Sequence, residues 1–120
     1  RGYLSMSVIF HLVRRSDWEG RGSVQEYSAP SLALEGFNHC SEDEAQLMAV
    51  AGRLYAGQTD MLVLEVETDL LTAQLKREPS RSGELYPHIY GPINASAVVA
   101  VRQLIAGNEG RFRLGPDIGV

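Results

Sequence analysis

The order of the predicted elements limits the fold more than any other feature of the chain. One long helix is predicted over residues 41–55, where apolar side chains recur at the spacing of a single helix face. Strands are predicted over residues 8–13, 61–67, 73–78 and 98–104, which contain no Gly or Pro. Strands follow one another in the second half without the helix that a parallel crossover needs. The expected fold class is therefore α+β, with one main helix and short helices on a mostly antiparallel sheet.

Two segments carry the Ser-x-x-Glu pattern of a capping box. Ser41 and Glu44 predict the start of the long helix, with the Ser41 side chain as the cap and Glu44 reaching back to it. Ser16 and Glu19 have the same spacing and predict a short helix that ends near Gly20. The buried face of the long helix is predicted to consist of Leu47, Met48, Ala51, Leu54 and Tyr55.

Length and composition indicate one globular domain. A chain of 120 residues, 44% hydrophobic and 22% charged, can bury a core of its own. We expect residues 6–106 to form the domain, residues 1–5 to precede it and residues 107–120 to form a weakly patterned tail. A single cysteine, no membrane-length apolar run and no signal peptide predict a cytoplasmic protein without a membrane partner. The net charge of −4 argues against generic nucleic-acid binding but allows a small nucleotide-like ligand.

All three histidines lie in short segments that also carry other polar or aromatic groups. His11 is inside the first predicted strand, where it is either a ligand contact or a half-buried histidine bonded to a backbone carbonyl. His39 lies just before the long helix. Two prolines and a glycine surround His88 and Tyr90, which predicts a stiff loop that presents both side chains to a pocket. The alternative for this loop is a rigid turn whose polar tips contact water.

The single cysteine, Cys40, is interpreted as a small packing residue. The acidic run that follows it opposes formation of a thiolate at the helix start. Three histidines and one cysteine would suffice in number for a zinc site, but no His-x-x-x-His or Cys-x-x-Cys pair anchors them, and no metal ligand is predicted. Glu78 and Glu84 are candidate carboxylate partners, although exposed charge is the default for a glutamate.

Several motifs along the chain occur together in one family. They are Ile9-Phe10-His11-Leu12-Val13, Asp17-Trp18, Tyr27 with Pro30-Ser31-Leu32, Glu35-Gly36-Phe37-Asn38-His39-Cys40-Ser41, Glu78-Pro79 and Pro87-His88-Ile89-Tyr90-Gly91-Pro92-Ile93. On these motifs the chain resembles the bacterial domain-of-unknown-function family 952, over about residues 8–104. Asn38, and Lys76-Arg77 before Glu78, depart from the residues usual in that family.

This family is in turn similar to the ADP-ribosyltransferase fold, and to its RNA 2′-phosphotransferase branch in particular. The resemblance implies a split, mostly antiparallel sheet that holds NAD in a cleft. It implies that His11 contacts the adenosine ribose and that His39-Cys40-Ser41 lies near the nicotinamide ribose. It places His88 or Tyr90 in a third motif, where a glutamate is usual and no catalytic glutamate is evident at that position.

We therefore predict a nucleotide-binding domain, with NAD as the expected ligand, in which the three histidines share one cleft. His39 and His88 are the predicted catalytic residues, for NAD-dependent ribosyl transfer or hydrolysis. His11, Ser41 and Tyr90 are the predicted ligand-binding residues, with Tyr90 stacked on a ring. A non-catalytic module that binds a small ligand or a protein is one alternative, which the lack of an evident glutamate favours. A histidine-based metal hydrolase is the other, and all three hypotheses require the histidines to converge.

Overall fold

The computed structural model describes residues 7–119, and the segment 1–5 set apart above lies outside the described residues. The fold is α+β with antiparallel sheets and few helices, which confirms the predicted class. No helix among residues 7–119 has both the length and the apolar character needed to cross a bilayer.

The larger sheet has four antiparallel strands in the order β1-β4-β8-β9. Their bounds are Val8–Arg14 for β1, Met61–Glu67 for β4, Val98–Ala106 for β8 and Phe112–Asp117 for β9. All of β4 except Glu65 is buried, because both faces of this central strand are covered. Its near-continuous run of apolar residues is typical of a strand buried on both sides.

The two faces of β4 belong to two separate parts of the core. Leu62 and Leu64 pack in one cluster with residues of β1 and β8. Met61 and Val63 pack in the other, against the helix α3 (Glu44–Leu54). The alternation that the sequence shows along β4 therefore sorts its side chains between two buried layers, and not between core and solvent.

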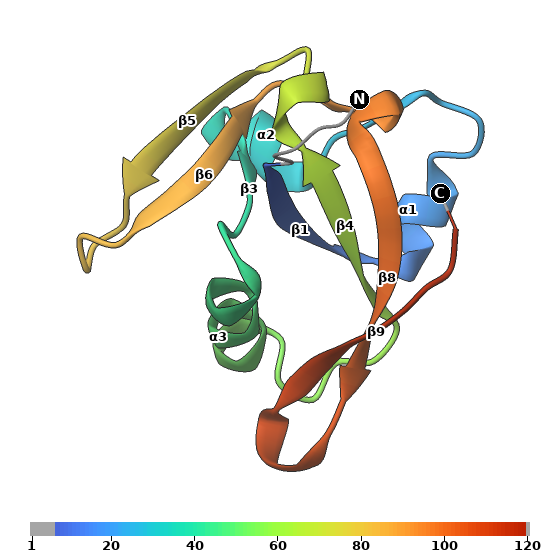
Figure 1. Ribbon diagram of the computed structural model, residues 1–120, viewed down its shortest axis with the longest axis vertical. Helices are drawn as coiled ribbons and strands as arrows, with labels where there is room; N and C mark the ends of the chain where they lie inside the picture. The colour runs from blue at the N-terminus through green and yellow to red at the C-terminus, as the bar shows by residue number, and fades with distance from the viewer. Residues whose placement is uncertain (1–6, 120) are drawn as a thin grey trace.

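A second antiparallel sheet has the order β3-β6-β5. Its strands are β3 (Asn38–His39), β5 (Gln74–Pro79) and β6 (Leu85–Tyr90), and β5 and β6 form a hairpin that projects from one side of the molecule (Figure 1). The predicted stiff loop around His88 is wrong, because residues 85–90 form the strand β6. The proline at position 87 is buried and lacks only an N–H, while its carbonyl still accepts from the backbone N–H of Cys40 at 3.0 Å.

The segment after β3 joins the two sheets. Phe10 of β1 and Ser41 exchange backbone hydrogen bonds of 2.9 and 2.8 Å, while His39 lies opposite His88 of β6. Residues 38–41 thus pair first with β6 of the three-stranded sheet and then with β1 of the four-stranded sheet. One short segment therefore connects two antiparallel sheets.

The long helix begins later than its capping-box pattern predicts. Its N-cap is Asp43, whose side chain accepts from the backbone N–H of Gln46 at 2.8 Å. Gln46 also reaches back and accepts from the backbone N–H of Glu42 at 2.7 Å. Ser41 does not cap this helix, because it is held in the bridge to Phe10. Leu54, predicted on the buried face, is exposed.

The remaining short elements surround these sheets. The helix α1 (Arg15–Gly20) has no side-chain cap, so the predicted Ser16–Glu19 box is also wrong, since the helix starts directly at the end of β1. Gly36 ends α2 (Pro30–Glu35) at a φ of 95°, a conformation that favours glycine. Small pairings and single 3₁₀ turns complete the chain: β2 (Glu26–Tyr27) with β7 (Ile93–Asn94), η1 (Thr68–Leu70), η2 (Ala95–Ala97) and η3 (Asn108–Gly110).

The segment predicted as a weakly patterned tail contains two short elements among its described residues, 107–119. Residues 108–110 form η3 and residues 112–117 form β9, an edge strand paired with β8. Phe112 and Leu114 pack on the cluster that holds α3 against the sheet. Frequent glycines and single apolar residues hide this strand from pattern analysis, because its pairing with β8 is a tertiary feature.

Candidate functional site

The three histidines lie on three different strands and line one pocket of about 670 Å³. His11 comes from β1, His39 from β3 and His88 from β6. They meet because the segment after β3 joins both sheets, which places His39 between the other two. The convergence that the sequence hypotheses required is therefore present.

His11 is buried, and its ring orientation is fixed by one hydrogen bond. Its Nδ1 lies 2.6 Å from the carbonyl oxygen of His39. Because a carbonyl only accepts, Nδ1 carries the proton and donates, which leaves Nε2 as an acceptor in the neutral ring. Nε2 is buried and has no hydrogen-bond partner among the described residues. His11 therefore has the backbone hydrogen bond expected of a structural histidine. Its Nε2 is a further acceptor that no described residue uses.

Burial also decides the charge of His11. The pKa of His11 is lowered to about 4, mainly by loss of solvent; the bond to the His39 carbonyl opposes this change, and the nearby His39 side chain adds to it. The imidazole is therefore neutral near pH 7. It can accept a hydrogen bond from a hydroxyl or an N–H of a ligand, but it supplies no positive charge.

His88 is held by the carboxylate of Glu78, one of the two glutamates that the sequence offered as candidate partners. Its Nδ1 lies 2.8 Å from Oε1 of Glu78, and the Tyr90 hydroxyl donates to the same oxygen. The hydrogen bond from Tyr90, followed by the one from His88, holds the pKa of Glu78 below its usual value. Phe37 stacks on the His88 ring with centroids 3.9 Å apart, so the ring is fixed both at its edge and on one face.

His39 is the most exposed of the three and forms a similar pair. Its Nε2 lies 3.2 Å from a carboxylate oxygen of Glu35, and about half of its side chain is exposed. The rings of His39 and His88 have centroids 5.4 Å apart, with Phe37 packed against both. Two of the three histidines are thus paired with a glutamate.

The other predicted site residues divide between the pocket and its surroundings. Ser41 is buried and lines the pocket next to His39. Tyr90 does not line it, since its hydroxyl is bonded to Glu78 and its ring leans on Phe37. Cys40 is buried, and loss of solvent raises the pKa of its thiol, which agrees with the interpretation as a packing residue.

Several pocket residues were not found from the sequence. Tyr86 lines the pocket with His88, two residues along the same strand, and alternation would have shown this had residues 85–90 been predicted as a strand. Arg14 and Arg53 also line it, and neither forms an ion pair within the described part of the chain. No local pattern marks these arginines, because α3 and β1 meet only in the folded protein.

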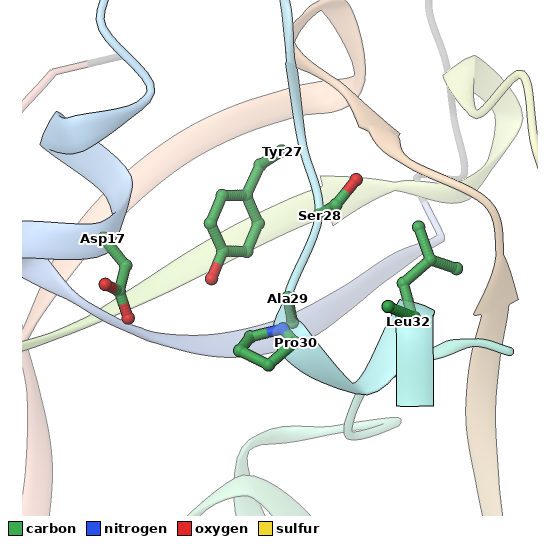
Figure 2. Close-up of a pocket in the computed structure, with 7 residues that line it drawn as sticks. Asp17, Tyr27, Ser28, Ala29, Pro30 and Leu32 are labelled. Carbon is green, nitrogen blue, oxygen red and sulfur yellow. The ribbon is translucent and has the colours of Figure 1, made fainter. Parts of the chain in front are cut away.

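A second, shallower depression of about 580 Å³ adjoins the histidine pocket. The two share Asp17, Tyr27, Ala29 and Pro30 in their linings. Figure 2 shows the Tyr27 hydroxyl directed toward the side where Asp17 lies. Burial, and then the charge of Asp17, raise the pKa of Tyr27 to about 12, so this hydroxyl keeps its proton at neutral pH.

A metal centre finds no support in this geometry. Within residues 7–119, no group of three or more His, Cys, Asp or Glu side chains is placed to hold a metal ion. The histidine nitrogens that face protein groups are bonded to a carbonyl or a carboxylate instead.

A family model described as "Protein of unknown function (DUF952)" matches residues 12–101 of the chain. The chain belongs to the DUF952 family. The matched range includes His39 and His88, with the strands that carry them, and begins one residue after His11. No curated protein matches the chain.

Solved structures similar to this DUF952 protein come from protein CC0527 of Caulobacter crescentus, a structural genomics target. Its crystal structure has a TM-score of 0.79 at 27% identity, covering 88% of this chain and 93% of that one. Its solution NMR structure has a TM-score of 0.75 at 28% identity, covering 88% and 91%. These structures do not bear on the similarity to ADP-ribosyltransferases, which stays a prediction.

Proposed function

We propose that this DUF952 protein binds a ribose-containing nucleotide, of the NAD type, in the pocket lined by the three histidines. The observation that carries the proposal is the Nε2 atom of His11. It is an acceptor by the tautomer that the His39 carbonyl imposes, it is buried, and no described residue donates to it. A buried polar atom without a partner costs about 1–3 kcal/mol, and a ligand hydroxyl is a donor that removes this cost.

Ribose suits this acceptor, because its hydroxyl groups donate without carrying charge. A neutral His11 accepts from such a group at any pH well above 4, whereas an imidazolium could not accept at all. The predicted contact between His11 and a ribose is retained in this proposal, with the direction of the hydrogen bond now defined.

The rest of the pocket supports a nucleotide in size and charge. A volume of about 670 Å³ lies in the range of about 300–1,000 Å³ that is usual for sites of small ligands and cofactors. Arg14 and Arg53 provide positive charge for a pyrophosphate, and Tyr86 provides an aromatic surface for a base.

Calorimetric titration with NAD⁺ tests the proposal directly. Wild-type protein is expected to bind NAD⁺, and His11→Asn is expected to weaken binding about tenfold or more. Asparagine can still donate to the His39 carbonyl but places no acceptor at the former Nε2 position, so the fold is retained while the ligand contact is lost. A thermal melt of the variant checks the fold.

Paired arginine variants test the phosphate contact. Arg53→Gln is expected to weaken NAD⁺ binding and to make that binding less dependent on salt. Arg113→Gln is the matched control, because it removes an exposed arginine of β9 that does not line the pocket.

Absence of NAD⁺ binding by the wild-type protein, or equal NAD⁺ binding by His11→Asn, contradicts the proposed function.

A further inference from the structure

The surroundings of His88 are those of a positioned general base. The Nδ1–H of His88 must donate to Glu78, because that carboxylate accepts two hydrogen bonds and its pKa is held low. In the neutral ring, Nε2 is then an acceptor, and it has no hydrogen bond to any residue in the range 7–119. A carboxylate that orients an imidazole in this way recurs wherever histidine removes a proton in catalysis.

Rigidity distinguishes His88 from an ordinary surface histidine. Only 12% of its side chain is exposed, although it lines the pocket. Phe37 is stacked on its face, and the hairpin partner β5 supplies Glu78 from the opposite strand, two positions from the residue directly opposite His88. The Tyr90 hydroxyl donates to Glu78, so Tyr90 restrains the carboxylate and the carboxylate restrains the His88 ring. Such preorganisation is what a general base requires.

We propose that His88, positioned by Glu78, is the general base that activates water to hydrolyse an N-ribosyl bond of the bound nucleotide. The inference rests on the proposed nucleotide site. His11 and His88 are both held as acceptors, so in the neutral form neither offers a proton from Nε2 to a leaving group. A leaving group that departs as a neutral heterocycle needs no proton, and a pyridinium N-riboside provides such a group.

The step balances without a further reactant. The oxygen of water forms a bond to the anomeric carbon, and the bond from that carbon to the ring nitrogen breaks. The bonding electron pair stays on the nitrogen, which turns the pyridinium into a neutral pyridine. The proton lost by water goes to Nε2 of His88 and then to solvent. No group is oxidised or reduced.

Release of nicotinamide from NAD⁺, measured by chromatography, tests the inference separately from binding. Wild-type protein is expected to release nicotinamide, and His88→Ala is expected to lower kcat about 10²- to 10⁴-fold. Added imidazole is expected to restore part of the rate in His88→Ala, because it supplies the missing base. Calorimetry on the same samples reports NAD⁺ binding, and thermal melts report folding.

Glu78→Gln tests the positioning role, with Glu44→Gln as the matched control at an exposed position of α3. Loss of the carboxylate is expected to lower kcat with little change in KM. A merely structural carboxylate would instead change the thermal melt, and it would not change kcat alone.

The outcomes are distinct. Binding of NAD⁺ by wild-type protein without release of nicotinamide overturns the role of His88 and leaves the proposed nucleotide site standing. An unchanged rate in His88→Ala, or an unchanged kcat in Glu78→Gln, also overturns it. Absence of NAD⁺ binding overturns both proposals together.

Discussion

Three residues of one type have three different roles in this pocket because their surroundings differ. Burial keeps His11 neutral, a carboxylate and a stacked ring fix His88, and solvent reaches about half of His39. The sequence identified all three as candidates, since histidine is rare here and lies in dense segments. It did not identify Glu78 as a partner of His88, because that contact crosses a hairpin whose second strand was predicted as a loop.

The depressed pKa of His11 has a consequence for stability. The folded protein binds a proton at His11 only near pH 4, whereas the unfolded chain binds it near pH 6.5. The unfolded state therefore takes up more protons between these values, and His11 contributes a loss of about 3 kcal/mol in the free energy of unfolding as the pH falls from 6.5 to 4.

Chemical denaturation across this pH range checks the prediction. The wild-type free energy of unfolding is expected to fall more steeply from pH 6.5 to 4 than that of His11→Asn, which has no imidazole to titrate at this position. Parallel curves for the two proteins would show that His11 is protonated as easily in the folded state as in the unfolded one.

At the scale of the elements, the sequence predicted most strands and helices but not their ends or their partners. Residues 61–67 and 98–104 have strong apolar patterns, and the structure places β4 and β8 there. The start of α3 was misplaced by two to three residues because backbone pairing with Phe10 takes Ser41 away from the helix. Patterns of local residues carry no information on such pairing, and the same holds for β6 and β9.

Asn38, next to His39, connects the start of α2 to the chain just after β6. Its Oδ1 accepts from the backbone N–H of Ala29 at 2.8 Å, and its Nδ2 donates to the carbonyl of Gly91 at 2.8 Å. Asn38 is fully buried, so Asn38→Leu leaves two backbone groups without partners. We expect a loss of about 2–5 kcal/mol in the free energy of unfolding.

Urea denaturation measures this loss, and Asn108→Leu, at an exposed position of η3, is the matched control. Equal stability of Asn38→Leu and the wild type would mean that the two backbone groups find other partners.

At the scale of the whole molecule, both ends of the described chain contribute to one core. The strand β1 begins at Val8, and β9 ends at Asp117, at opposite edges of the four-stranded sheet (Figure 1). Residues 107–120 were expected to be a weakly patterned tail, with its docking left open. The packing of Phe112 and Leu114 on the cluster beneath α3 indicates that this segment stabilises the fold.

Truncation after Ala106 tests this contribution. The shortened protein is expected to lose about 2–5 kcal/mol in the free energy of unfolding, because the apolar contacts of Phe112 and Leu114 are removed and the edge of β8 is exposed. A thermal melt of the truncated and full chains measures the change. Arg113→Gln, at an exposed position of β9, is the control and is expected to have no effect.

The four residues 38–41 have one further consequence, which concerns how such a site can evolve. They join the two sheets through backbone pairs, and the same stretch supplies His39 and Ser41 to the pocket. An insertion or deletion there shifts the backbone pairs and both pocket side chains together, so it alters the architecture and the chemistry at once. A change of ligand preference is expected to arise more easily from substitutions at pocket positions outside this stretch, such as Arg53 and Tyr86. Such substitutions change the pocket and leave the backbone pairs between the two sheets unchanged.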